Sequence, residues 1–263
     1  MRIFLINLAR ATERLDKMDR QFKVLGIAYE RLDATDGASI SEADRAMVDD
    51  ERRKRFTEYP LSDNEIGCWL SHRHAMLTLL ESGEEMAAVV EDDADLSPDF
   101  AAVLKAVAER KPQFDFIFLH RKFKKGEKFY PCMKLLPGLH LGVVGYAHMG
   151  AIAYIVSREG AKKFISYTPR FVHAVDKEIH RYWANGLKVY GLERPVVVTS
   201  DGGYSYIEET RLQDNNKPTR FRYHDSHMLS QRLMRRFTRI SESVRKHVCF
   251  YFYLHSLKRE NAT

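Results

Sequence analysis

The first 37 residues carry the pattern that most restricts how this chain can fold. Residues 3–6 form a short apolar run, and residues 11–25 place their apolar side chains at helical spacing. Residues 29–32 form a second short strand candidate before a turn-rich sequence. The pattern predicts a β-α-β unit with a right-handed crossover. Sheets built from such units bind ligands at the carboxyl ends of their strands, so we expect the functional site there.

The rest of the first 210 residues continues this alternation of strands and helices. Ser62 and Glu65 form a capping box, which opens a helix over residues 63–82. Further strands are expected at 86–90, 114–119, 152–156, 188–190 and 196–198, and further helices after residue 97 and at 157–167 and 175–184. The segment 121–134 is basic, aromatic and turn-prone, which indicates a loop over the site. The sequence therefore predicts one α/β domain over residues 1–210.

The charge of the chain is divided unevenly between this domain and the rest. The whole chain has 42 Lys and Arg against 36 Asp and Glu, whereas residues 211–263 alone hold 12 against 4. The first 210 residues therefore carry a slight acidic excess. This distribution excludes a protein that coats nucleic acid along its whole length, and nucleic acid is an improbable partner.

The basic tail, residues 211–263, contains an amphipathic helix over residues 228–248. Its apolar residues share one helical stripe and are flanked by arginines; they are Leu229, Leu233, Phe237, Ile240 and Val244. Such a helix can lie on an anionic membrane surface. It can equally pack against its own domain or a partner subunit in an oligomer, or contact an acceptor or nucleic acid.

The cysteines and the apolar runs bear on the compartment. Cys68, Cys132 and Cys249 are widely spaced, which gives neither a disulfide framework nor a zinc knuckle and indicates a reducing compartment. The apolar start is too short for a signal peptide. No apolar run approaches the roughly 20 residues that a bilayer-spanning helix needs. We expect a cytoplasmic protein, soluble or peripheral on the inner face of the cytoplasmic membrane.

Four acidic side chains directly follow the buried strand at residues 86–90: Glu91, Asp92, Asp93 and Asp95. Carboxylates this close repel one another unless a cation or hydrogen-bond donors offset their charge. In an extended segment, Glu91, Asp93 and Asp95 would share one side. Oxygen ligands suit Mg²⁺ or Mn²⁺, so a metal site that bridges a nucleotide diphosphate is the functional interpretation. A solvated acidic turn is the alternative.

Several short motifs occur in a characteristic order. They are Asn7-Leu8 with Arg10 and Arg14, Asp33-Ala34, residues 61–72, residues 90–93, and Gly150 before a strand-Ser-helix unit. In this order they resemble glycosyltransferase family 25 over about residues 1–210. This is the family of lipooligosaccharide β-1,4-galactosyltransferases, to which collagen-modifying glycosyltransferase domains are related. The resemblance implies a GT-A-like, Rossmann-like fold with a mixed sheet flanked by helices, followed here by the basic helical tail.

The resemblance also implies which residues form the site. The nucleotide-sugar donor, most often UDP-galactose, would contact Asn7, Leu8, Arg10, Arg14, Asp33, Ser71, His72, Glu91, Asp92, His148 and Gly150. Asp93 and Asp95 would bind Mn²⁺ or Mg²⁺, with Asp93 as the first choice. The motif departs from the family pattern because it begins with Glu and is followed by a fourth acid. The division of the acids between metal and ribose therefore stays open.

The resemblance also implies transfer with inversion at the anomeric carbon, which needs a base that deprotonates the acceptor hydroxyl. Asp176 is the first candidate and Glu178 the second, because family members have an acid at the start of a helix in this region. An acid favoured there by the helix dipole is the alternative explanation.

The sequence thus predicts an inverting, metal-dependent glycosyltransferase that moves a hexose, most readily galactose from UDP-galactose. The acceptor would be a lipid-linked oligosaccharide, the core of a lipooligosaccharide or lipopolysaccharide. Two alternatives remain: a non-catalytic module on the same fold that binds membrane or nucleic acid, and a nucleotidyltransferase.

Overall fold

The structure is a computed structural model of the whole chain. It describes residues 1–120, 128–144, 150–200, 222–223 and 228–260, with only the backbone of 255–260. His148 and the glycine-rich segment after residue 200 lie outside the described residues.

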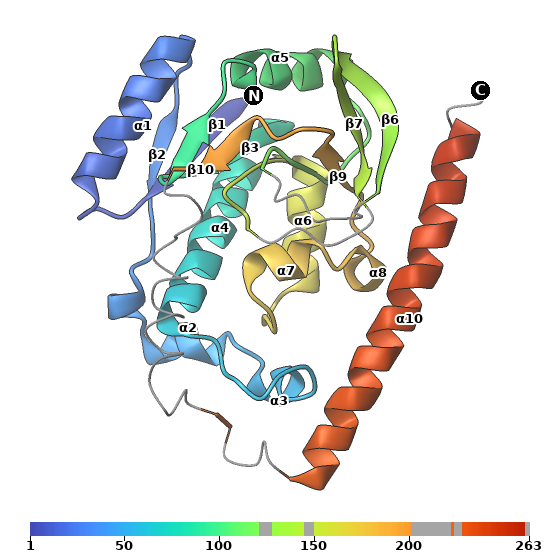
Figure 1. Cartoon of the computed structure of the whole chain (residues 1–263). Helices are drawn as coiled ribbons and strands as arrows, with labels where there is room; N and C mark the ends of the chain where they lie inside the picture. The colour runs from blue at the N-terminus through green and yellow to red at the C-terminus, as the bar shows by residue number, and fades with distance from the viewer. Residues whose placement is uncertain (121–127, 145–149, 201–221, 224–227, 261–263) are drawn as a thin grey trace.

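A mixed eight-stranded sheet forms the centre of the protein, in the order β2-β1-β3-β8-β5-β9-β7-β6 (Figure 1). Its strands are β1 (Arg2–Asn7), β2 (Glu30–Asp33), β3 (Met86–Glu91), β5 (Phe116–Phe118), β6 (Phe129–Leu136), β7 (Leu139–Val144), β8 (Ala153–Ser157) and β9 (Val189–Leu192). β1 pairs in parallel with both β2 and β3, as the predicted β-α-β unit requires. β3 pairs antiparallel with β8, which makes the sheet mixed.

Helices cover both faces of this sheet, and the sheet divides the apolar core between them into two layers. The longer ones are α1 (Thr12–Leu25), α4 (Asp63–Glu81), α5 (Phe100–Arg110) and α6 (Arg158–Tyr167). Phe22 of α1 and Phe100 of α5 pack in one apolar cluster, whereas Trp69 of α4 and Phe164 of α6 pack in the other. β1 serves both clusters because its successive side chains point to opposite faces of the sheet. This architecture confirms the expected α/β, GT-A-like fold.

Shorter elements fill the connection between β2 and α4. They are the 3-10 turn η1 (Gly37–Ser39) and the helices α2 (Glu42–Ala46) and α3 (Asp50–Arg53). The capping box of Ser62 and Glu65 that opens α4 is present. It confirms the predicted start of this helix.

Three local predictions were wrong. The segment 129–134, expected as loop, belongs to β6, an edge strand whose register is irregular around Pro131. Proline has no N–H to donate to a neighbouring strand, and an edge strand tolerates it because one side of the strand has no neighbour. The expected helix 175–184 is two short helices, α7 (Val175–Ile179) and α8 (Tyr182–Asn185), because the backbone of Arg181 leaves the helical region. The acidic stretch is not extended: a turn at Asp92 and Asp93 separates β3 from β4 (Ala94–Leu96).

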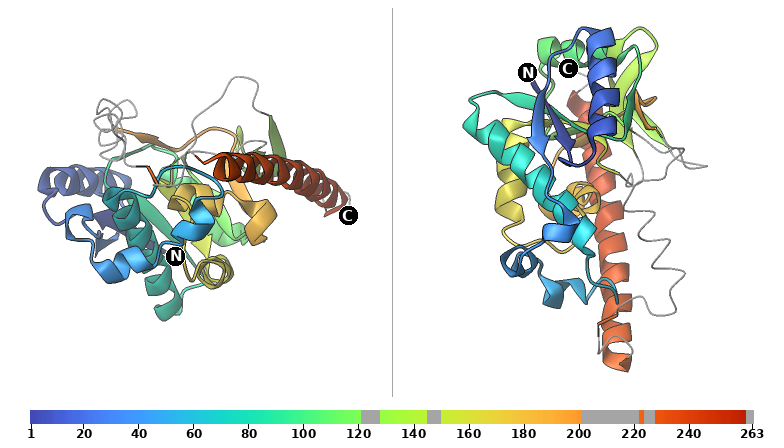
Figure 2. Two further views of the ribbon diagram at one scale, coloured as in Figure 1. Left: turned by 90° about the horizontal axis from the view of Figure 1, so that it is seen from below. Right: turned by 90° about the vertical axis from the view of Figure 1, so that its left-hand side faces the viewer.

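β4 pairs with β10 (Val197–Thr199) in a separate two-stranded sheet. The tail forms α10 (Leu229–Glu260), one long helix beside α8 whose first turns extend past the rest of the domain near α3 (Figures 1 and 2). Among the described residues, no helix is long and apolar enough to cross a membrane.

Candidate active site

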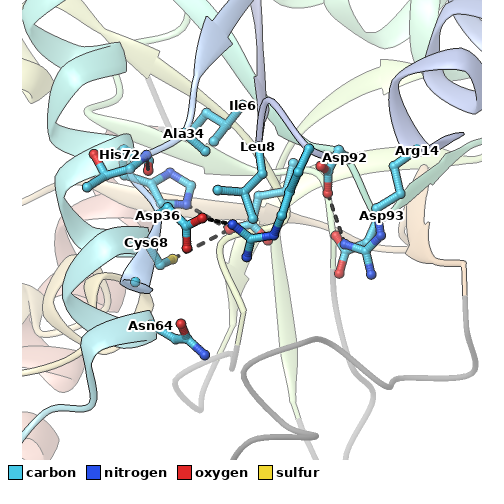
Figure 3. A pocket seen from close by; sticks show the side chains of 15 residues that line it. Ile6, Leu8, Arg14, Ala34, Asp36, Asn64, Cys68, His72, Asp92 and Asp93 are labelled. Carbon is cyan, nitrogen blue, oxygen red and sulfur yellow. Dashed lines mark hydrogen bonds and ion pairs between the residues drawn. The ribbon is translucent and has the colours of Figure 1, made fainter. Parts of the chain in front are cut away.

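A pocket opens at the carboxyl ends of β1, β2 and β3, where the sequence pattern placed the ligand site. Side chains of α4 line one side, and Arg14 with Asp92 and Asp93 lines the opposite side (Figure 3). Eight predicted residues line this pocket: Leu8, Arg10, Arg14, Ser71, His72, Glu91, Asp92 and Asp93. The structure thus brings together residues that are far apart in the sequence.

Asp92 is held by two donors from the first β-α unit. The Asn7 amide donates to Oδ2 of Asp92 at 2.7 Å, and the Arg14 guanidinium donates to Oδ1 at 3.0 Å. Asn7 is itself oriented by Arg31, whose Nε donates to the Asn7 amide oxygen at 2.9 Å. These contacts compensate the charge of Asp92 within the protein. Asn7 and Asp92 therefore fix the acidic turn, and Arg14 also lines the pocket.

Asp93 is in the opposite situation. Its side chain is buried, and its Oδ1 atom has no hydrogen-bond partner among the described residues. Burial, reinforced by the negative charge of Glu91, raises the pKa of Asp93 to about 7. A buried carboxylate oxygen without a donor, next to two further acids, is the arrangement that a hard cation stabilises. The residues at this turn therefore fit a Mg²⁺ or Mn²⁺ ion.

Glu91 is kept ionised by a buried histidine. Nε2 of His72 lies 2.8 Å from Oε1 of Glu91, and Nδ1 lies 3.0 Å from the Tyr154 hydroxyl. Burial and the charge of Glu91 raise the pKa of Tyr154 well above its usual value, so the phenol keeps its proton. Because an ionised carboxylate only accepts, the Nε2–H of His72 donates to Glu91. Although burial opposes ionisation, the hydrogen bond from His72 lowers the pKa of Glu91. The pKa of Glu91 is therefore lowered and that of Asp93 is raised, although both carboxyl groups line the same pocket.

Cys68 completes a second cluster that could in principle hold a metal. One potential ligand atom from each of Cys68, His72 and Glu91 lies within 4.8 Å of the others. Burial, followed by the charge of Glu91, raises the pKa of the Cys68 thiol well above its usual value. A protonated thiol is a poor ligand. The cluster is better described as hydrogen-bonded support for Glu91, and the sequence analysis did not assign a role to Cys68.

The loop after β2 forms the remaining wall. A side chain at Gly67 would place its Cβ 2.6 Å from the Thr35 carbonyl oxygen, so the loop approaches α4 closely. The Ser71 hydroxyl accepts from the Thr35 N–H at 2.9 Å and donates to the Gly67 carbonyl at 2.7 Å. Asp36 lines the pocket and pairs with Arg10. Ser71 therefore positions this wall as well as lining it.

Asp33 does not line this wall, although the sequence analysis assigned it to the donor. Its side chain is 73% exposed and pairs with Arg31 at 2.7 Å. Asp36 takes its place in the pocket. The turn-rich sequence after β2 contains both acids, but the sequence alone did not show which one faces inward.

Asp176 lies close to the same site, although it comes from α7. Its Oδ2 atom accepts a hydrogen bond from the Gly150 N–H at 2.8 Å, and Gly150 has a φ of +104°, which favours glycine. The negative charge of Asp176 also contributes to the raised pKa of the Cys68 thiol, which is evidence of proximity. Asp176 is therefore near Cys68, although neither Asp176 nor Gly150 lines the pocket.

Glu178, the second candidate base, is placed differently. It is buried, and its Oε1 atom accepts from Arg181 at 3.0 Å. Burial raises the pKa of Glu178, and the charge of Arg181 opposes this shift. Glu178 does not line the pocket. Its contacts are those of a structural ion pair.

His120 is a residue at this site that the sequence analysis missed. It follows β5, and a Cβ at Gly150 would lie 3.8 Å from its ring. Its charge contributes to the lowered pKa of Glu91, after the effects of His72 and Cys68. Only the position of its strand in the sheet could have shown this proximity.

The comparison with known proteins agrees with this geometry. The family model described as "Glycosyltransferase family 25 (LPS biosynthesis protein)" matches residues 1–179, which include every residue that lines the pocket and Asp176. The chain belongs to glycosyltransferase family 25. The expected family is therefore confirmed.

Several animal proteins are similar to this family 25 member. A glycosyltransferase 25 family member of Anopheles gambiae is 32% identical over 177 residues, which cover 64% of this chain and 29% of the relative. A family member of Aedes aegypti is 31% identical over 245 residues, which cover 81% of this chain and 39% of the relative. Procollagen galactosyltransferase 2 of Homo sapiens is 26% identical over 243 residues, which cover 81% of this chain and 38% of the relative. The chain spans less than half the length of these curated relatives.

In this family 25 member, Asp95 is separated from the acids of the pocket. Its carboxylate accepts from the Ser200 hydroxyl at 3.0 Å and pairs with Lys17 at 2.8 Å. It does not line the pocket, because the turn at Asp92 and Asp93 carries the chain away along β4. Its proposed role as a metal ligand stays a prediction, as does the donor contact of His148, which lies outside the described residues.

Proposed function

We propose that this family 25 member is an inverting, metal-dependent galactosyltransferase that uses UDP-galactose. The observation that carries the proposal is the unsatisfied, buried Oδ1 atom of Asp93 in a pocket that also contains Arg10 and Arg14. A site that combines a cation position with arginines suits a diphosphate. A module that had lost its activity would have no use for a buried acid at this cost in stability.

The acidic turn would hold the ion through Asp93. When bound, Mn²⁺ or Mg²⁺ supplies positive charge for the phosphates of the departing UDP. Arg14 is already positioned by Asp92, so it can face the diphosphate without further ordering. Leu8 and the loop around Asp36 offer the nucleoside an apolar and a polar wall.

Asp176 would act as the base. Transfer with inversion requires the acceptor hydroxyl to attack the sugar from the face opposite the leaving group, with loss of its proton to a nearby group. The Gly150 N–H donates to the Asp176 carboxylate and thereby orients it, which supports this role. Glu91, held by His72, can accept a hydrogen bond from a hydroxyl of the donor.

The proposed acceptor is a lipid-linked oligosaccharide, the core of a lipooligosaccharide or lipopolysaccharide, used at the cytoplasmic face of the membrane. The description of the family model names lipopolysaccharide biosynthesis, which supports this choice. Relatives named procollagen galactosyltransferases support galactose as the transferred sugar. A procollagen peptide is therefore the comparison acceptor in any test.

The experiment measures UDP release from UDP-galactose, UDP-glucose and UDP-N-acetylglucosamine with Mn²⁺, Mg²⁺ or EDTA. Truncated lipooligosaccharide and procollagen peptide serve as acceptors. We expect acceptor-dependent UDP release from UDP-galactose with metal, and its loss in Asp93→Asn. Asp99→Asn is the matched control, because Asp99 is an exposed acid that pairs with Arg194 on the surface. No UDP release from any donor would overturn the proposal, and pyrophosphate release from a nucleoside triphosphate would favour a nucleotidyltransferase.

A further inference from the structure

In the part of the chain that the structure describes, α10 contacts the domain through the side that carries Glu242 and Tyr253. The carboxylate of Glu242 accepts from Arg181 and from the Trp183 indole, both at 2.8 Å. Further along the helix, the Tyr253 ring stacks on Tyr182 and Tyr190. These contacts define the docked side of the helix.

The predicted apolar stripe lies on the opposite side. Leu233 and Glu242 are nine residues apart, which places them about 180° apart on the helix at roughly 100° per residue. Leu229 is 70% exposed, Phe237 is 72% exposed and Val244 is 57% exposed. The outward face of α10, which we define by this stripe, comprises Leu229, Leu233, Phe237, Ile240, Val244, Val248 and Tyr251, all of which are exposed. It extends over about 33 Å at roughly 1.5 Å per residue.

Positive charge borders this outward face. Arg232, Arg236 and Arg239 are exposed along one edge of the stripe, and Arg245 is exposed beyond its other edge. The only acid between residues 229 and 254 is Glu242, which is on the docked side and paired with Arg181. The outward face is therefore apolar in the middle and cationic at its borders, with no acid of its own.

We propose that the outward face of α10 binds an anionic phospholipid bilayer, with the helix lying in the plane of the surface. Its aliphatic side chains would enter the boundary between headgroups and acyl chains, and the arginines would contact lipid phosphates. Exposure of so many large apolar side chains in one stripe costs solvation free energy unless a partner covers them. The proposal does not depend on the identity of the sugar donor.

Two other occupants fit this surface less well. A second copy of the chain, packed through the same face, would bring arginines against arginines without an acid to neutralise them. A single-stranded nucleic acid could place its phosphates against the arginines, but five of the seven apolar side chains of the stripe are aliphatic and offer no ring on which a base can stack. A bilayer with anionic headgroups satisfies both the charge and the apolar surface.

The test is flotation of the full chain with vesicles, without sugar nucleotide. One set of vesicles contains phosphatidylethanolamine and phosphatidylglycerol, and the other contains phosphatidylcholine alone. We expect flotation with the anionic vesicles, weakened by salt, and little with phosphatidylcholine. Phe237→Ser with Ile240→Ser should abolish it. Arg232→Gln, Arg236→Gln and Arg239→Gln together should weaken binding about a hundredfold, at roughly fivefold per cation.

Matched controls separate this face from general charge and from folding. Lys23→Gln, Lys105→Gln and Lys162→Gln together remove the same charge from other exposed helices and should leave flotation nearly unchanged. Circular dichroism checks that each variant is folded. Equal flotation of the Phe237 and Ile240 variant, or equal binding to both vesicle types, would overturn the proposal. A dimer that light scattering detects in the unmodified protein but not in the Phe237 and Ile240 variant would also overturn it. So would single-stranded DNA that competes with vesicles for the unmodified protein but not for the arginine variant. Asp93→Asn should float like the unmodified protein, which separates this result from the fate of the proposed function.

Discussion

Nε2 of His72 lies 2.8 Å from Oε1 of Glu91 at the floor of the pocket. This contact opposes the effect of burial and keeps the pKa of Glu91 below its ordinary value. It therefore links a buried ring on α4 to the charge state of a residue that lines the pocket.

His72→Phe should move the acidic limb of the pH–activity profile to higher pH. Without the Nε2–H donor, burial is opposed by the smaller effects of Cys68 and His120, so the pKa of Glu91 rises and its charge is lost at a higher pH. Tyr154→Phe is the comparison variant, since it removes only the hydrogen bond to Nδ1 and should cause a smaller shift. The check is the ratio of maximal rate to KM from pH 5 to 9; identical profiles for all three proteins would contradict the assignment.

Asp93 should make the metal-free protein less stable as pH rises. The folded-state pKa of about 7 exceeds the unfolded value of 3.8, so the folded state retains a proton that the unfolded state has lost. Stability should fall by up to about 4 kcal/mol between the two pKa values. Asp93→Asn should remove most of this dependence. Urea unfolding in EDTA at pH 5 and pH 8 measures the free energy of unfolding at each pH, with Asp99→Asn as control. If the difference between the two pH values is the same in Asp93→Asn as in the unmodified protein, the prediction is refuted.

Asp93 and Asp95 should differ in their effect on donor binding. Asp93→Asn should abolish the Mn²⁺-dependent part of UDP binding, because the ion loses the carboxylate in the pocket. Asp95→Asn should weaken it less, since Asp95 is engaged by Lys17 and Ser200 outside the pocket. Titration calorimetry with UDP, with and without Mn²⁺, distinguishes them. Equal losses would restore Asp95 as a metal ligand.

Asp176→Asn should lower the maximal rate by about 10²- to 10⁴-fold with little change in the KM for UDP-galactose, as expected for loss of a base. Glu178→Gln should instead reduce stability through Arg181 and leave the rate of the folded fraction largely intact. Initial rates and thermal unfolding of both variants decide between them. A larger rate loss in Glu178→Gln would reverse the assignment.

Glu242→Ala should loosen α10. The variant leaves the buried Arg181 with Glu178 alone and removes the acceptor of the Trp183 indole, at a cost of about 1–3 kcal/mol. Urea unfolding and limited proteolysis near the helix report the loss. Ser243→Ala, at an exposed neighbouring position, is the control; equal protection of both variants would show that the contact is dispensable.

Patterns local in the sequence predicted their part of the structure well. The predicted capping box at Ser62 and the predicted end of β3 at the acidic residues are confirmed, because caps and strand ends depend on neighbouring residues. Features set by tertiary contacts were missed. Asp36 rather than Asp33 faces inward because the loop is drawn against Gly67. His120 affects the pKa of Glu91 because a single strand, β8, separates β5 from β3. The exposed stripe of α10 was predicted, but its docked side depends on the single acid Glu242 and on buried Arg181.

Both oxygens of Asp92 are already engaged, one by Asn7 and one by Arg14. The turn that carries Asp93 is thereby fixed before any ligand arrives. An incoming nucleotide sugar then loses none of its binding free energy to ordering this part of the backbone, and its reacting groups meet a preorganised floor. Substitution of Asn7 should therefore slow turnover through conformational entropy, although Asn7 itself does not line the pocket.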